Sequence, residues 1–156
     1  MINTLDSLLT FENIYLYANW GVVPFWLLLI LIPSHGITKF FSHSIIAPLF
    51  LATAYIFVTR QIILEGNTFE GFNLYLGLDG LDEVYSNESL RLVFWLHFLA
   101  LSLFVGAWIA RDSERHMVPK FLSAPCIIIT YFTGPFGIVI YWFIRIFYAK
   151  KINFNE

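Results

Sequence analysis

Four long apolar stretches, separated by polar segments, dominate the pattern of hydrophobic and polar positions along the chain. They cover residues 14–32, 44–64, 90–110 and 121–148. A helix needs about 20 apolar residues to cross the hydrocarbon core of a bilayer, so each stretch predicts a transmembrane helix. Apolar and polar residues do not alternate within these stretches, which argues against the strands of a transmembrane β-barrel.

The connections between the stretches differ in length and character. Residues 34–43 and 111–120 are short, so the helices that they join should be antiparallel neighbours. Residues 65–89 carry six carboxylates around an apolar middle that is too short to span, and we expect this middle to lie on the membrane surface, with a break at Asp79-Gly80. The predicted fold is all-α: a polytopic membrane protein with one domain over residues 1–156, built as a bundle of four transmembrane helices with a short interfacial segment between helices two and three.

The composition agrees with a membrane protein and excludes several other classes. The 156 residues are 58% hydrophobic and only 13% charged, with a mean hydropathy of +0.71, whereas soluble domains carry about 25% charged residues. A disordered chain, a nucleic-acid-binding protein and a typical cytosolic enzyme are therefore excluded. The single cysteine, Cys126, cannot form a disulfide within the chain. In the four-helix arrangement the nine Lys and Arg residues divide four against five between the two sides, which leaves the orientation open.

Few charged groups fall inside the predicted spans. No carboxylate lies well within them, and the arginines near their ends, including Arg91 and Arg145, can extend to the interface. This distribution disfavours paired-carboxylate catalysis, a di-metal site and a proton-driven transporter. His97 is the one ionisable side chain expected near mid-membrane. It either performs a function there or bonds to a neighbouring helix as a structural contact.

Two further features surround His97 in the predicted arrangement. Helical spacing places it on one stripe with Phe104 and Trp108, which could flank an elongated apolar ligand or simply pack. Another face of the same helix carries Trp95, Ser102 and Gly106, and its small residues favour close approach of a second helix.

The last stretch is interrupted by Gly134-Pro135-Phe136-Gly137. Proline removes a backbone donor, so the helix should bend there, either as the wall of a pocket or as a purely structural kink. A haem held by two histidines would need a second buried histidine, because the other three lie in predicted loops. No spacing of His or Cys residues indicates a metal site, and we expect no metal and no other cofactor.

With these residues in view, the chain resembles the abscisic-acid-deficient-four-like family of small membrane proteins. The resemblance rests on Trp-x-His, a following Leu-Phe-Val-Gly, a Pro-Cys pair and a Gly-Pro-x-Gly. These fall on Trp95 and His97, on residues 103–106, on Pro125 and Cys126, and on Gly134, Pro135 and Gly137. Similar positions in the first half, such as Pro24 and Pro33, extend the likeness over nearly the whole chain.

The resemblance implies a role in carotenoid metabolism, because the plant member is needed to form neoxanthin from violaxanthin. The chain departs from the family pattern at two places, where Ser102 replaces the usual Asp and Ala107 the usual Arg. Loss of this pair removes the best candidates for proton transfer and leaves His97 to act with Ser102 or with water.

Three functions remain open. The first is a carotenoid- or xanthophyll-modifying enzyme of isomerase type, with His97 as catalytic acid or base. Its substrate would be a lipid-soluble polyene. The second is a non-catalytic protein that binds a pigment, pairs with itself or docks on another membrane protein, and the third is a haem or quinone electron carrier. We expect an integral protein of a bacterial inner membrane or a plastid-type membrane, with no nucleic-acid partner. The predicted binding residues are Trp95, Ser102, Phe104, Gly106, Trp108, Gly134 and Pro135.

Overall fold

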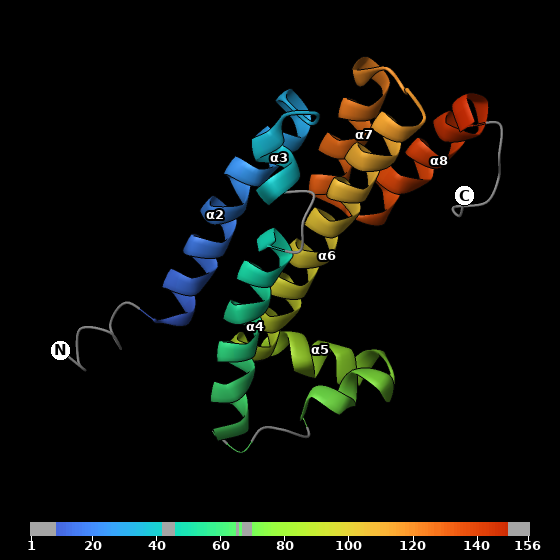
Figure 1. Cartoon of the computed structure of the whole chain (residues 1–156). Helices are drawn as coiled ribbons and strands as arrows, with labels where there is room; N and C mark the ends of the chain where they lie inside the picture. Colours follow the sequence, from blue (N-terminus) through green and yellow to red (C-terminus); the bar gives the residue numbers. More distant parts are fainter. Residues whose placement is uncertain (1–8, 42–45, 65, 67–69, 150–156) are drawn as a thin grey trace.

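A computed structural model describes residues 9–41, 46–64, 66 and 70–149, and every regular element in these ranges is a helix (Figure 1). The all-α class predicted from the sequence is therefore confirmed for the described residues. The elements, in chain order, are α2 (Phe11–Leu31), α3 (Gly36–Phe41), α4 (Ile46–Leu64), the 3-10 helix η1 (Glu70–Tyr75), α5 (Leu78–Ser86), α6 (Glu88–Arg115), α7 (Lys120–Thr133) and α8 (Pro135–Ala149).

Three stretches are long and apolar enough to cross a membrane: Phe11–Leu31, Gly36–Leu64, which contains α3 and α4, and Glu88–Arg115. They correspond to the first three predicted spans, although the predicted start at Ser44 lies outside the described residues. Helix α6 extends beyond its predicted limits at both ends. The Asn87 side chain caps its first turn by accepting hydrogen bonds from the backbone N–H groups of Ser89 and Leu90. These three stretches indicate that the protein is associated with a membrane.

The fourth predicted span differs from the prediction, because the structure divides it into α7 and α8. Gly134 separates the two helices with a φ of 64°, a conformation that glycine adopts without strain. Pro135 follows and has no backbone N–H with which to continue the first helix. At 1.5 Å per residue, α7 and α8 are about 21 and 23 Å long, and neither reaches across a hydrocarbon core of about 30 Å.

Helices α7 and α8 form an antiparallel hairpin beside the second half of α6. A Cβ atom placed on Gly134 would lie 3.1 Å from the Phe98 ring and 3.4 Å from Ser102 Oγ, near the middle of α6. At the open end of the hairpin, Arg145 of α8 contacts Asp112, close to the end of α6. The chain thus runs from the end of α6 back to its middle and returns, as Figure 1 shows.

Helix α6 is central to the packing and contacts α2, α4, α5, α7 and α8. Gly106 lets the Trp26 indole of α2 pack directly on the α6 backbone, since a Cβ atom there would lie 2.5 Å from Trp26 Cζ3. The edge of the same indole meets the Tyr131 ring of α7, with the ring centroids 5.2 Å apart. The small-residue face predicted for this helix therefore forms a contact between α2, α6 and α7.

The apolar middle of the connection between α4 and α6 forms η1 and α5. Figure 1 shows α5 lying crosswise to the long helices, where α4 ends and α6 begins. The predicted break at Asp79-Gly80 is wrong, because the two elements separate at Gly77, whose φ is 135°. Gly80 instead lies inside α5, where a Cβ atom would collide with the backbone of Asn73 in η1.

Candidate functional site

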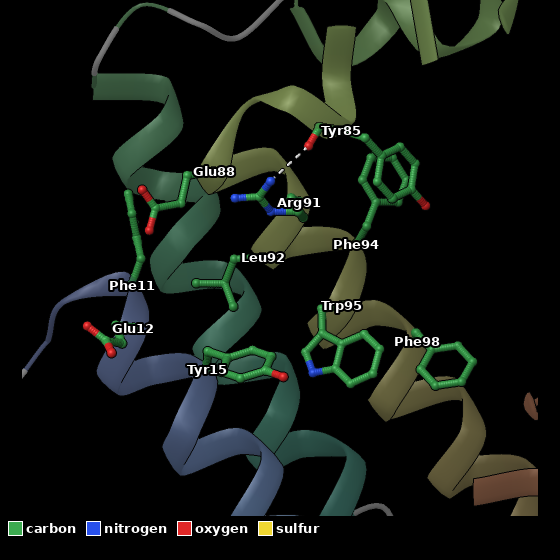
Figure 2. Close-up of a pocket in the computed structure, with 10 residues that line it drawn as sticks. All are labelled: Phe11, Glu12, Tyr15, Tyr85, Glu88, Arg91, Leu92, Phe94, Trp95 and Phe98. Carbon is green, nitrogen blue, oxygen red and sulfur yellow. Dashed lines mark hydrogen bonds between the residues drawn. The ribbon is translucent and has the colours of Figure 1, made fainter. Parts of the chain in front are cut away.

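A partly open cavity of about 660 Å³ lies between the N-terminal halves of α2 and α6 and the end of α5 (Figure 2). Most of its walls are aromatic, and its charged side chains come from the first turns of α2 and α6. The lining residues are Phe11, Glu12, Tyr15, Tyr85, Glu88, Arg91, Leu92, Phe94, Trp95 and Phe98.

The aromatic rings of the cavity support one another. Trp95 stacks on Phe98 with a centroid separation of 5.4 Å and an interplanar angle of 26°, and the Tyr15 ring lies 6.1 Å from Trp95. The indole Nε1 of Trp95 donates a hydrogen bond of 3.1 Å to Asn19 Oδ1 on α2. The indole is thus oriented by stacking on α6 and by a hydrogen bond to α2, which makes it a fixed part of the wall.

Helix α5 forms a second aromatic wall. The Tyr85 ring stacks on Phe94 at a centroid separation of 5.4 Å and an angle of 16°. The guanidinium of Arg91 donates a long hydrogen bond of 3.4 Å to the Tyr85 carbonyl oxygen, which Figure 2 shows as a dashed line. Both contacts join the end of α5 to the first turns of α6.

The polar groups of the cavity gather at one end. Glu12, Glu88 and Arg91 lie in the first turns of their helices and are exposed. The opposite end is apolar and is formed by Trp95 and Phe98. An elongated apolar molecule with a polar end would match this distribution, because its apolar body would displace little bound water and its polar end would stay among charged groups.

The deep end of the cavity meets the tip of the α7–α8 hairpin. Phe98 lines the cavity, and its ring also lies against Gly134. Ser102, one turn further along α6, is buried next to the same glycine. The break in the last apolar stretch therefore lies beside the cavity, although Gly134 itself does not line it.

The predicted site residues separate into three groups in the structure. Trp95 lines the cavity, and Ser102 and Gly134 lie behind its deep end. Gly106 packs on Trp26, and Trp108 packs edge-on against Tyr141 at 5.8 Å, away from the cavity. The third group, Phe104 and Pro135, is exposed on the surface of the helices.

His97 lies outside the cavity lining. Its side chain is exposed on the flank of α6 that faces α4, where its ring centroid is 6.2 Å from that of Tyr55. Adjacent residues of a helix point about 100° apart, so Trp95 and Phe98 can face the cavity while His97 does not. A role for His97 in chemistry within the cavity would need a ligand that reaches around α6.

Most of the cavity residues, including Tyr15, Tyr85 and Phe98, were not predicted from the sequence. Trp95 and Phe98 are three residues apart and so share a helix face. This spacing is visible in the sequence and could have identified Phe98 as a neighbour of Trp95. The contributions of α2 and α5 depend on tertiary packing, and no local pattern in the sequence places them against α6.

A second polar cluster lies at the other end of α6 and corrects two predictions. Arg145 was expected to extend to the interface, but it is buried, with 2% of its surface exposed, and its Nε donates a hydrogen bond of 2.7 Å to Asp112 Oδ2. Asp112 is itself buried inside α6 and accepts a second hydrogen bond, of 2.8 Å, from the Tyr141 hydroxyl. Asp112 was expected in the connection 111–120, but α6 continues through it, and its carboxylate is buried near the end of this helix, where two donors from α8 satisfy it.

His116 completes this cluster at the end of α6. Its Nε2 lies 3.2 Å from Arg145 Nη2 and 3.5 Å from Asp112 Oδ1. Its Nε2 therefore lies between the guanidinium of Arg145, which can only donate a hydrogen bond, and the carboxylate of Asp112, which can only accept one. In the described part of the chain, no group of three or more His, Cys, Asp and Glu side chains is arranged to hold a metal ion.

A family model described as ABA DEFICIENT 4-like matches residues 13–141 of the chain. The matched region includes every cavity residue except Phe11 and Glu12, and it includes Asp112 and Tyr141 of the buried cluster. No curated protein and no solved structure shows significant similarity to the chain.

Proposed function

The chain belongs to the ABA DEFICIENT 4-like family, and from that premise we propose that it binds a carotenoid or a similar polyene in the cavity between α2, α5 and α6. The family supports a carotenoid-related membrane protein. The observation that carries the proposal is the aromatic wall of Trp95, Phe98, Tyr85 and Phe94 in a partly open cavity at one end of the long helices.

The dimensions of the cavity favour the binding of one end of such a molecule. Its lining on α6 runs from Glu88 to Phe98, which corresponds to about 15 Å of helix at 1.5 Å per residue. A carotenoid is about as long as the hydrocarbon core is thick, about 30 Å. One end ring and part of the chain would fit against the aromatic wall, and the rest would extend into lipid.

The cavity supports binding more directly than conversion. Isomerisation or epoxide opening starts with protonation, and the acid or base predicted for it, His97, lies on the α4 side of α6. Binding is therefore the first part of the proposal, and an isomerase-like activity at His97 is the second. The position of His97 favours the alternative, a pigment-binding protein without turnover.

Co-expression of the full chain in a carotenoid-producing host tests binding. We expect the purified protein to carry a polyene absorption band, and Trp95→Ala and Phe98→Ala to reduce the bound pigment on the order of tenfold, since loss of one buried aromatic contact costs roughly 1.5–3 kcal/mol. Phe104→Ala is the matched control, because it removes an aromatic ring from an exposed position of the same helix. A colourless wild-type protein, or equal pigment loss in all three variants, would contradict binding in this cavity.

The same host tests conversion. If His97 acts as acid or base, the wild-type chain changes the carotenoid profile of the host and His97→Ala abolishes the change while the protein keeps its pigment. An unchanged carotenoid profile together with pigmented wild-type protein would eliminate the isomerase hypothesis and leave the binding hypothesis standing. A Soret band in the purified protein would instead support the electron-carrier function.

A further inference from the structure

The η1–α5 segment presents a group of large apolar side chains that are mostly exposed. Four of them fall within seven residues of the turn between the two elements. Their exposed fractions are 63% for Phe72, 79% for Tyr75, 81% for Leu76 and 80% for Leu78. Exposed apolar groups of this density mark a surface that contacts another apolar phase or partner. We refer to these four residues as the apolar tip.

The apolar tip is held by a folded element. Val84 of α5 is buried with 1% of its surface exposed, and the Tyr85 ring stacks on Phe94 of α6. Within the segment, Asn73 Nδ2 donates a hydrogen bond of 3.1 Å to Glu83 Oε2, which ties η1 to α5. The apolar tip is therefore displayed in a fixed position relative to α6.

The neighbouring helices fix the level at which the segment lies. It connects the end of α4 at Leu64 with the start of α6 at Glu88, and both helices belong to stretches long enough to span a membrane. Because spanning helices end at the boundary between acyl chains and headgroups, a segment that joins two such ends lies at that boundary. Its orientation crosswise to the long helices in Figure 1 is that of an element lying along a membrane surface.

The polar groups of α5 agree with this position. Asp79, Asp82 and Glu83 are exposed on the same short helix that begins with Leu78 of the apolar tip. Acidic side chains beside an apolar tip match a boundary where water and acyl chains lie a few ångströms apart. Tyrosine, which the apolar tip contains as Tyr75, is enriched at this boundary because its ring is apolar and its hydroxyl polar.

We propose that the apolar tip inserts into the lipid surface at the boundary between headgroups and acyl chains, in the leaflet that contains the first turns of α2 and α6. Tyr85 of the same segment lines the cavity, so this anchor holds that wall of the cavity at that leaflet. If the proposed function holds, the polyene reaches the cavity laterally from this leaflet and not from water.

Fluorescence depth measurement on the full chain in phosphatidylcholine vesicles tests the anchor without any polyene. An environment-sensitive dye is attached to Leu76→Cys or, as the matched control in the same segment, to Asp82→Cys, with Cys126→Ala removing the native thiol. We expect the dye at position 76 to show blue-shifted emission and strong quenching by lipids that carry a nitroxide near the headgroup. The dye at position 82 should respond mainly to a water-soluble quencher.

Two results would overturn the anchor. Equal emission and equal aqueous quenching at positions 76 and 82 would place the apolar tip in water. Protection of position 76 from both the lipid and the aqueous quencher would show that protein covers it. A chain that binds no pigment but gives the expected quenching would refute the proposed function and leave the anchor standing.

Lateral access has its own test, which measures pigment uptake by protein prepared without pigment. The double variant Leu76→Glu/Leu78→Glu should take up polyene from loaded vesicles several-fold more slowly than wild type, with the same final amount bound, because the cavity residues are unchanged. The control variant Asp79→Asn/Asp82→Asn alters the same helix without adding charge to the apolar tip. An unchanged uptake rate in the Glu variant would contradict access through the anchored leaflet.

Discussion

Single residues of α6 decide which helices can approach it, and Gly106 is the clearest case. The Trp26 indole occupies the space where a side chain would begin, at 2.5 Å from the ideal Cβ position. In a bilayer, such close contacts drive helix association, because lipid tails are as apolar as the side chains they would replace. Because Gly106 has no side chain, α2 can pack directly on the α6 backbone. This contact stabilises the pair of helices, as a large apolar side chain does in a soluble core.

Gly106→Ala should lower the free energy of unfolding by about 1–3 kcal/mol, the usual cost of adding a methyl group to a well-packed contact. Thermal unfolding of the purified protein in detergent measures the loss. Gly36→Ala is the matched control, because its added methyl group meets no atom within 4 Å in α3. A second variant, Gly106→Ala/Trp26→Leu, should recover part of the loss by making room for the methyl group. Equal stability of the two single variants would contradict the contact.

At the scale of elements, the sequence predicted helices more successfully than their pairing. Three spans were found because twenty consecutive apolar residues are a local signal. The α7–α8 hairpin was not predicted, because a largely apolar stretch of 28 residues with a Gly-Pro break fits a bent span and a hairpin equally well. In the structure the hairpin is joined to α6 by the hydrogen bond between Arg145 and Asp112, 33 residues apart in the chain, and hydropathy carries no information about such a pair.

The candidate site also combines features that the sequence predicts locally with features that depend on tertiary packing. Trp95 was predicted from its position in a span, whereas its contact with Asn19 on α2 depends on a pairing 76 residues apart. The stripe that contains His97 and Phe104 has helical spacing, but the structure leaves both residues exposed and outside the cavity lining. Periodicity shows which residues share a face, and tertiary packing decides which face surrounds a cavity.

The buried cluster should hold the hairpin against α6. Arg145→Met leaves the Asp112 carboxylate buried with one donor fewer, and we expect a loss of about 3–5 kcal/mol. Asp112→Leu/Arg145→Met removes both charges and should lose less than the sum of the single variants. Hydrogen exchange identifies the element affected: amides of α8 should exchange faster in Arg145→Met, while those of α4 stay near the wild-type rate.

Lys120→Met serves as the control for this experiment, because it removes an exposed cation at the start of the same hairpin. It should leave both stability and exchange close to wild type, as exposed charges contribute about 0–1 kcal/mol. Additive losses for Asp112→Leu and Arg145→Met would show that the two side chains do not act as a pair.

At the scale of the whole molecule, the hairpin changes the distribution of charge between the two sides. Because α8 returns toward the end of α6, its last residues lie on the same side as that end. Among the described residues, four cations besides the buried Arg145 lie at or near that side: Lys39, Arg111, Arg115 and Lys120. Two cations of the described residues, Arg60 and Arg91, lie at the other side. Cytoplasmic sides are enriched in Lys and Arg, so the C-terminal end of α6 should face the cytoplasm. The cavity, which lies at the N-terminal end of α6, should then lie toward the opposite leaflet.

This orientation and the hairpin can be tested together by cysteine labelling in a background with Cys126→Ala. Met117→Cys follows α6, Tyr148→Cys lies near the end of α8, and Asp82→Cys lies on α5; all three positions are exposed. A maleimide that cannot cross membranes should label positions 117 and 148 from the cytoplasmic side only, and position 82 from the opposite side only. If residues 121–148 formed a fourth spanning helix, the chain would cross the membrane once between the end of α6 and residue 148. Position 148 would then lie on the same side as position 82. Labelling of 148 and 82 from one side would therefore refute the hairpin, and labelling of 117 and 148 together from the non-cytoplasmic side would refute only the orientation.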